Sequence, residues 1–332
     1  MRRHWLATVL LLLTLRVPDM AEAAKASVLI DFDPESSAQT VVVDSINAGP
    51  RGRLHACDRV SGKVWRIDPS NPKLIVVGRV QERNVGGKRV RADVSGIVLN
   101  QAGDIYLTAR GFKEVLRIRE RNLNSNEPGV AETFATETDG ANGIAFDRNG
   151  YLYVSGGDNG KIYRTGPEGG RAAIIAQIAP HARTVPKGKT ARALTANGIV
   201  FDKQGSTLYI ADGARGAIWQ LAIGNDGKAG QPQLMTQSAL LEGADGPSFD
   251  PQGNLWVAAN ERHAVVLVQP DGRAFDVLKN DSKGPLEFPT AVVFIGATAY
   301  VSNFGMARRD KLSVGGKTSS DGIGASIIKI EP

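Results

Sequence analysis

Apolar and polar side chains alternate over short stretches of this chain, and a polar turn separates one stretch from the next. Residues 197–212 show the pattern most completely, with an apolar run, a turn at 202–205 and a second alternating run. Asp202 can hydrogen-bond the backbone ahead of it, and Gly205 tolerates the positive φ that the end of such a turn requires. The pattern predicts a β-hairpin.

This hairpin recurs along the chain at nearly constant intervals. The opening glycines lie at positions 96, 143, 198 and 246, and a turn glycine follows each of them seven residues later. The same spacing, counted back from Gly52 and Gly296, predicts two weaker copies that open at Asp44 and Phe288. Six repeats of about fifty residues are typical of a circular array of four-stranded blades. We therefore predict an all-β fold, a six-bladed β-propeller.

Each end of the repeat array carries one further strand pattern. Residues 26–32 and 326–330 alternate in the manner of strands, but neither has a partner within its own repeat. A closed ring can complete one blade from both ends of the chain, which removes open sheet edges. We expect these two strands to share the sixth blade.

The first 23 residues have the pattern of a signal peptide. Arg2 and Arg3 precede an apolar run at 5–15, which is too short to span a bilayer, and a small-x-small cleavage site ends at Ala23. We predict a signal peptide at 1–23, a single propeller domain at 24–332, and a periplasmic or secreted protein. Later apolar stretches are shorter than a membrane span, so no transmembrane anchor is expected after cleavage.

Composition narrows the possible partners. The formal net charge is +6, but no basic face with interleaved aromatic residues is evident, so nucleic acid is not an expected partner. The single cysteine, Cys57, lies in a predicted strand and is expected to be a small buried apolar residue. No coiled coil is predicted, and we expect a monomer.

Basic residues gather in two long connections between repeats, at 80–92 and 180–195. Such charges are commonly just solvated. The alternative is a cationic rim that attracts anionic ligands.

The position before each opening glycine supplies the candidate site. In a propeller the first strand of each blade lines the central channel, so these positions lie at one height around it. In repeat order they are Asp44, Ser95, Asn142, Asn197, Asp245 and Phe288. Converging carboxylate and amide oxygens suit a hard cation such as Ca²⁺. The alternative is that these residues only shape the turn before a glycine.

Two of the motifs resemble those of the senescence-marker-protein (SMP-30)/gluconolactonase family of regucalcin-like six-bladed propellers. Asn197-Gly198-Ile199 is followed by Leu-Tyr-Ile-Ala-Asp at 208–212, and Asp245-Gly246-Pro247 by Gly-Asn-Leu-Trp-Val-Ala at 253–258, the more specific match. The resemblance covers nearly all of residues 40–305.

The resemblance implies one divalent metal at the channel mouth, held by Asn197, Asp245 and a blade-one residue. The blade-one position is Asp44 here, where the family has Glu in a Glu-Gly-Pro motif. Asn142 corresponds to a substrate-binding Asn beside the metal, but the family's basic residue two positions earlier is replaced by Gly140. Ca²⁺ is the expected ion, with Zn²⁺, Mn²⁺ and Mg²⁺ as alternatives.

The resemblance further implies a lactonase-like hydrolase that acts on a lactone or a sugar-acid-like small molecule. Asp245 would then be the catalytic base as well as a ligand. The alternative function is a non-catalytic, NHL-like propeller that binds a ligand or a protein partner. The histidines at 55, 181 and 263 lie at unrelated positions of the repeats, and no Gly-x-Ser-x-Gly motif is present, so a nucleophilic triad is not predicted.

Overall fold

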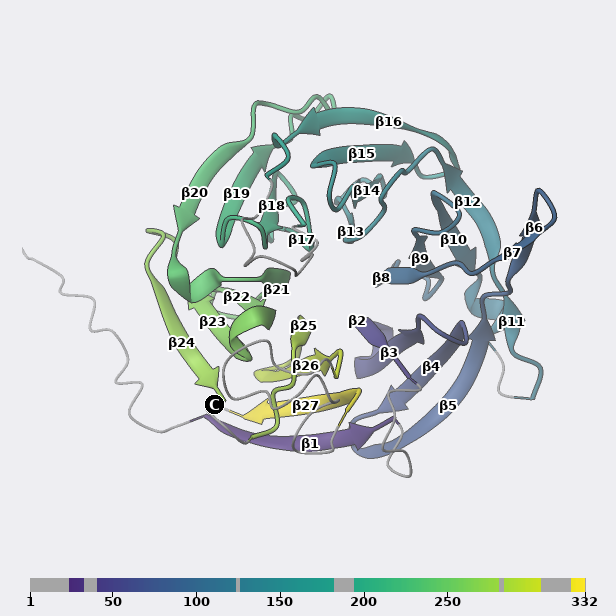
Figure 1. Cartoon of the computed structure of the whole chain (residues 1–332), viewed down its shortest axis with the longest axis horizontal. Helices are drawn as coiled ribbons and strands as arrows, with labels where there is room; N and C mark the ends of the chain where they lie inside the picture. The colour runs from purple at the N-terminus through teal and green to yellow at the C-terminus, as the bar shows by residue number, and fades with distance from the viewer. Residues whose placement is uncertain are drawn as a thin grey trace, which may run out of the picture.

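Short antiparallel strands arranged in a ring make up nearly all of the regular structure (Figure 1). The computed structural model describes residues 24–32, 41–123, 126–181, 194–280, 284–305 and 324–331. The predicted signal peptide, at 1–23, and residues 182–193 of the second basic connection therefore lie outside the described residues. Across the described ranges, helices are too short and too polar to cross a membrane.

Within these ranges, strand pairing forms six four-stranded antiparallel units, which we call blades 1 to 6. Blade 1 contains β2 (Val43–Gly49), β3 (Arg53–Asp58), β4 (Lys63–Asp68) and β5 (Asn71–Arg79); blade 2 contains β8 (Val94–Leu99), β9 (Ile105–Ala109), β10 (Glu114–Ile118) and β12 (Glu132–Thr136); blade 3 contains β13 (Ile144–Phe146), β14 (Leu152–Ser155), β15 (Lys161–Gly166) and β16 (Gly169–Gln177). Blade 4 contains β17 (Ile199–Phe201), β18 (Thr207–Asp212), β19 (Ala217–Ala222) and β20 (Gln233–Gln237); blade 5 contains β21 (Ala244–Phe249), β22 (Leu255–Ala259), β23 (Ala264–Val268) and β24 (Ala274–Lys279); blade 6 contains β25 (Pro289–Ile295), β26 (Thr298–Asn303), β27 (Ser326–Glu331) and β1 (Lys25–Asp31).

The first strand of each blade lies nearest the centre of the ring in Figure 1. This arrangement confirms the predicted β-propeller fold and fits the predicted number of blades. We call the end of the central channel at which these first strands begin the mouth.

Blade 6 is assembled from the two ends of the described chain, as the terminal strand patterns predict. The C-terminal β27 pairs with β26 on one side, and the N-terminal β1 pairs with β27 on the other. Ile328 lies opposite Val301 in the first pairing and opposite Val28 in the second. Because backbone hydrogen bonds across β27 join the two ends, the ring closes in the neighbourhood of its own termini.

Aromatic side chains at equivalent positions hold neighbouring blades together. An aromatic residue of a second strand packs edge-to-face on a phenylalanine near the end of the next blade's first strand, with ring centroids about 5 Å apart. The four pairs are Tyr106–Phe146, Tyr153–Phe201, Tyr209–Phe249 and Trp256–Phe294. His55 occupies the corresponding position of blade 1 and is buried there, and Cys57 is buried in the same strand, as predicted.

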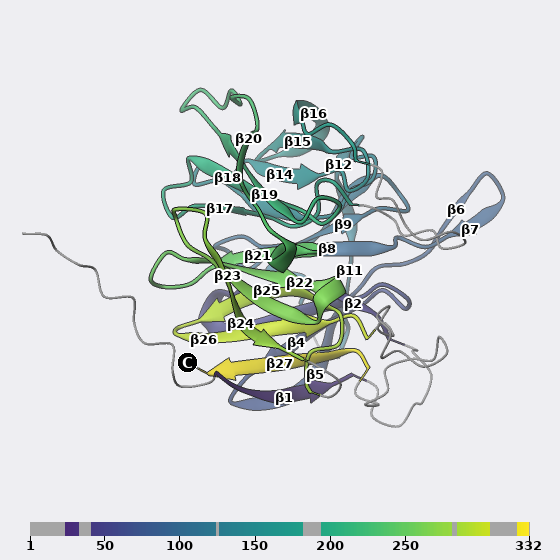
Figure 2. The ribbon, with the colours of Figure 1, turned by 60° about the vertical axis from the view of Figure 1, so that its left-hand side comes forward.

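Short elements connect the blades. The first basic connection folds into a hairpin of β6 (Arg83–Val85) and β7 (Lys88–Val90), which projects from the ring (Figures 1 and 2). The short strand β11 (Gly129–Val130) adds in parallel to β5. Four 3-10 turns complete the described structure, namely η1 (Pro50–Gly52), η2 (Glu120–Asn122), η3 (Ala239–Leu241) and η4 (Asn260–Arg262).

Closure through β27 predicts a large stability effect at Ile328, whose side chain is completely buried. Ile328→Ala should lower the free energy of unfolding by about 2–5 kcal/mol, because it removes apolar contacts and leaves a cavity. The matched control is Val28→Ala on the paired strand, where 42% of the residue is exposed, and its effect should stay within about 0.5 kcal/mol. Urea unfolding measures both variants, and equal midpoints would contradict the role given to β27.

Candidate functional site

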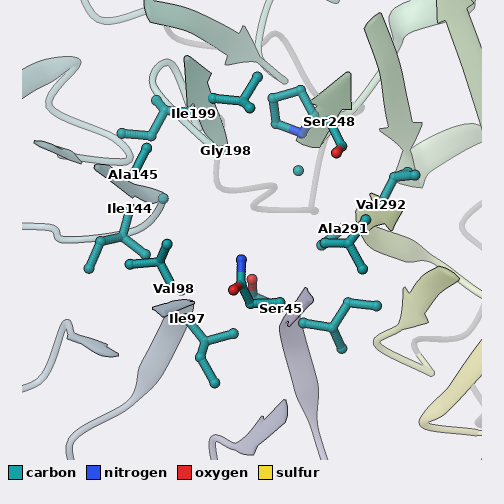
Figure 3. Close-up of a pocket in the computed structure, with 18 of the residues that line it drawn as sticks. Ser45, Ile97, Val98, Ile144, Ala145, Gly198, Ile199, Ser248, Ala291 and Val292 are labelled. Carbon is teal, nitrogen blue, oxygen red and sulfur yellow. The ribbon is translucent and has the colours of Figure 1, made fainter. Parts of the chain in front are cut away.

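The central channel contains a cavity of about 420 Å³ that is lined by the first strand of every blade. Ile97, Ile144, Ile199 and Val292 are arranged around the space in Figure 3, and polar groups make up a comparable share of the wall. Polar side chains lie where the first strands begin, at the mouth: Asp44, Ser95, Asn142, Asp245 and Thr290. The cavity thus combines apolar side chains with convergent polar groups, as small-molecule sites do.

The sixth member of the polar ring is Thr290, which corrects the predicted Phe288. Ala291 pairs with Gly246 across the blade boundary, so the residue equivalent to Asp245 is Thr290. The hairpin of blade 6 closes with two residues, since Ile295 pairs with Thr298, whereas the hairpin of blade 5 needs five between Phe249 and Leu255. A constant spacing from the turn glycine therefore fails in this blade. Phe288 instead precedes β25 and donates its backbone N–H to Nδ1 of His263 at 2.9 Å.

Asp44 lies at the mouth as predicted, but it is bound to an arginine. Nη1 of Arg59 lies 2.9 Å from Oδ2 of Asp44, and the same guanidinium donates two hydrogen bonds to Oδ1 of Asp93. Burial raises the pKa of Asp44, and Arg59 only partly offsets this effect. The pKa of Arg59 is itself raised: burial would lower it, but the charges of Asp44 and Asp93 outweigh that effect. Arg59 therefore remains a cation between two carboxylates.

Asp245 is buried at the same mouth, in the first strand of blade 5, and only blade 6 separates it from blade 1 around the ring. Its Oδ2 accepts a hydrogen bond of 3.2 Å from Nδ2 of Asn260, in the turn η4 that follows the second strand of the blade. The pKa of Asp245 is raised well above its usual range by burial first, and then by the negative charge of Asp44. Hydrogen bonds from Asn260 and Asn197 act in the other direction but are weaker. A positive charge near Asp245 would favour its ionised form.

Asn197 lies just behind the cavity wall, which is formed there by its neighbour Gly198. Its Nδ2 donates to the carbonyl oxygen of Ala244 at 3.4 Å, and its own carbonyl oxygen accepts the hydroxyl of Ser155. The side-chain Oδ1 is completely buried and has no hydrogen-bond partner among the described residues. A buried acceptor without a partner costs about 1–3 kcal/mol.

These donors fit a hard cation. Asp44, Asn197 and Asp245 offer two carboxylates and an amide oxygen, which is the donor chemistry that Ca²⁺ prefers. Arg59 takes Oδ2 of Asp44, so a cation would use Oδ1 of that residue. Among the described residues, no three His, Cys, Asp or Glu side chains come together to hold a metal. A cation at the mouth would therefore depend on the amide oxygen of Asn197 as well as on the carboxylates.

Two of the residues that shape this site were not predicted from the repeats. Arg59 lies in the turn after β3 and Asn260 in the turn after β22, and both second strands end at the mouth. The signal available in the sequence was their place directly after a second strand, where a turn faces the channel opening. The position of Arg59 recurs as Arg110 directly after β9 in blade 2, whereas Asn260 has no equivalent asparagine in the other repeats.

The burial and hydrogen bonds of the described histidines are those of structural residues. Burial and the nearby Arg66 lower the pKa of His55 to about 4, so its ring is neutral at pH 7. His263 is buried and accepts the Phe288 N–H through Nδ1. His181 is exposed, and its backbone N–H donates to the hydroxyl of Thr195.

Residues 183–302 match the family model described as "SMP-30/Gluconolactonase/LRE-like region". This stretch is about a third of the chain, and it is similar to that family, in agreement with the resemblance of the motifs at Asn197 and Asp245. A search among curated proteins finds no match to this chain.

Several solved structures are similar to this chain over most of its length. A luciferin-regenerating enzyme is 15% identical with a TM-score of 0.66, over 93% of this chain and 95% of that one. A gluconolactonase from Xanthomonas campestris is 13% identical with a TM-score of 0.61, over 92% and 89%. Virginiamycin B lyase from Staphylococcus aureus is 12% identical with a TM-score of 0.57, over 93% and 99%. At such identities the likeness establishes the fold, and the chemistry must be argued from the site.

The raised pKa of Asp245 predicts that the cation-free protein loses stability as the pH rises. Because the pKa is higher in the folded than in the unfolded state, the folded protein holds more protons between the two values, and the free energy of unfolding falls with increasing pH. Asp245→Asn has no charge to bury, so it should unfold at higher urea concentration than the wild type at pH 7. A tenfold change in the acid dissociation constant corresponds to about 1.4 kcal/mol.

Urea unfolding between about pH 5 and pH 8, with divalent cations removed, tests this expectation. The control is Asp271→Asn, at an exposed turn carboxylate whose pKa is lowered by hydrogen bonds from Arg273. That variant should not gain stability at pH 7. If Asp245→Asn and the wild type show the same slope with pH, Asp245 is not protonated in the way described.

Proposed function

We propose that this protein is an exported, metal-dependent lactonase-like hydrolase, similar to gluconolactonases, with one divalent cation at the mouth of the propeller. The observation that carries the proposal is the buried Oδ1 of Asn197, which has no partner among the described residues and lies beside the buried carboxylate of Asp245. Both groups are costly to bury as they stand, and one cation would compensate both.

In this proposal Asn197, Asp245 and Oδ1 of Asp44 hold the cation, and Ca²⁺ is the ion that their oxygens favour. When bound, the cation would supply Lewis-acid polarisation of the lactone carbonyl. The cation would favour the ionised form of Asp245, which accepts a proton from the attacking water. Asn260 orients that carboxylate through its hydrogen bond to Oδ2.

The cavity suits a small substrate of this class. Its volume of about 420 Å³ lies within the range of small-molecule sites. Asn142 lines the cavity and is nearly buried, so its amide is placed to orient a polar substrate. The signal peptide predicted at 1–23 makes export to the periplasm or the medium part of the same proposal.

One observation favours the second candidate function, a propeller that binds a ligand without turnover. Arg59 already matches the charge of Asp44 at 2.9 Å, so the blade-one carboxylate is less available to a cation than a Glu without such a partner would be. In that function the same cavity would hold a small molecule, and Asp245 would have no proton to transfer.

The metal proposal predicts a specific effect of Asn197→Ala. Removing the amide oxygen should weaken Ca²⁺ binding by roughly 10–100-fold or more, because a ligand is lost from a site with few others. Isothermal titration calorimetry measures the affinity, and the matched control is Asn142→Ala, at the equivalent position of blade 3. That control should keep the Ca²⁺ affinity of the wild type. Equal affinities for Asn197→Ala and the wild type would remove Asn197 from the metal site.

The catalytic proposal predicts that Asp245→Asn lowers kcat by roughly 10²–10⁴-fold, since the substitution removes the proton acceptor but keeps the size of the side chain. The measurement is turnover of a panel of lactones, with Ca²⁺ at saturating concentration for both proteins. Asp271→Asn, at an exposed turn, should retain wild-type turnover.

Two results would contradict this mechanism in different ways. Equal turnover by Asp245→Asn and the wild type would exclude Asp245 as the base. If neither protein hydrolyses a lactone but a ligand still occupies the cavity, the protein is a binding propeller.

A further inference from the structure

A second cavity, of about 450 Å³, lies at the mouth end of blade 1 and shares no lining residue with the central cavity. The turn after β3, the end of β5 and the base of the β6–β7 hairpin enclose it. Its charged lining consists of four arginines and one glutamate, namely Arg59, Arg79, Arg89, Arg91 and Glu82.

The positive charge in this cavity is only partly compensated, because Arg59 pairs with Asp44 and Asp93 but two other arginines have no partner in the described part of the chain. Arg79 and Arg91 are exposed, and their side chains make no ion pair or hydrogen bond with any described residue. Arg89 pairs with Glu82 at 2.8 Å, but 83% of the arginine side chain remains exposed. Like charges that converge without partners repel one another, and a bound anion would reverse that repulsion.

Arginines elsewhere in the described ranges commonly have carboxylate partners. Four examples are the pairs Arg83–Glu114, Arg110–Asp158, Arg117–Glu132 and Arg262–Asp276, with N–O distances of 2.6–2.7 Å. Arg79 and Arg91 of the second cavity, by contrast, have no carboxylate partner among the described residues.

Tight backbone contacts fix two walls of the cavity. Val80 donates its N–H to the carbonyl oxygen of Gly62 at 2.8 Å, and a Cβ on Gly62 would lie 2.2 Å from the carbonyl oxygen of Val80. On the other side, Gly111 donates to Ala92 at 2.8 Å, and a Cβ on Gly111 would lie 2.1 Å from the carbonyl oxygen of Arg91. The backbone that carries Arg79 and Arg91 is thus anchored next to each arginine.

We propose that this second cavity binds a small organic oxyanion with more than one negative charge, carried by carboxylate or phosphate groups. A guanidinium presents paired donors that match either group in a bidentate manner. The cavity volume is larger than a single inorganic ion requires and lies within the range of small-molecule sites. The site goes beyond the proposed hydrolysis, because binding there requires neither a cation nor turnover at the channel mouth.

Calorimetric titration of the protein, dialysed free of divalent cations, with citrate and with inorganic phosphate tests the proposal. At least one of these probes should bind at physiological ionic strength, where diffuse attraction over more than about 8 Å is screened. Binding of citrate alone would assign carboxylates, and binding of phosphate alone would assign phosphate groups. Failure of both probes to bind would overturn the proposal.

The double variant Arg79→Gln/Arg91→Gln should weaken the binding by roughly tenfold or more, because charge-assisted hydrogen bonds are lost. The matched control is Arg51→Gln/Arg273→Gln, which removes the same charge from exposed residues in turns at the other end of the blades. Equal weakening in both double variants would mean that the anion senses only net charge, and would also overturn the proposal. Asp245→Asn, which disables the proposed hydrolysis, should bind the probes as the wild type does.

Discussion

The backbone pairing of β27 with β26 and β1 is the constraint on which the rest of the structure depends. A ring of repeats brings equivalent positions to one place only if it is closed, and here the closing strand comes from the opposite end of the chain. Ile328, completely buried, anchors that strand, while its partner Val28 is partly exposed. Because closure is made by backbone hydrogen bonds, the channel geometry does not depend on any single side chain at the mouth.

Closure has an electrostatic consequence at the mouth. Carboxylates that are more than two hundred residues apart in the chain, Asp44 and Asp245, lie close enough for the charge of one to raise the pKa of the other. Arg59 offsets part of this repulsion through its contact with Asp44. The fold thus holds two acidic groups in an environment that disfavours their ionised form, next to an amide oxygen without a partner among the described residues. Such arrangements commonly mark functional sites.

The fold leaves the chemistry open. Solved structures named as a luciferin-regenerating enzyme, a gluconolactonase and a lyase share it with this chain at 12–15% identity. The local features of this chain at the mouth are the pairing of Asp44 with Arg59 and a basic cavity next to that arginine. The two cavities meet at Arg59, whose side chain lines one cavity and binds a residue that lines the other.

The sequence by itself determined the propeller fold, the sharing of blade 6 by both ends, and five of the six positions in the polar ring at the mouth. It could do so because a hairpin that recurs at a near-constant interval places equivalent residues at equivalent positions around the ring. The prediction for the sixth position was wrong because the blade 6 hairpin closes with two residues. Only strand pairing shows that Thr290 occupies the position predicted for Phe288.

Only the tertiary structure decided which hydrogen bonds and ion pairs the side chains at these positions make. Three features are side-chain contacts that the repeat pattern does not specify: the partnership of Arg59 with Asp44 and Asp93, the hydrogen bond from Asn260 to Asp245, and the burial of the Asn197 amide. Hydrogen bonds and desolvation depend on distances of a few ångströms between residues far apart in the chain. A periodic pattern specifies which residues face the channel, whereas these distances emerge only when the ring is closed.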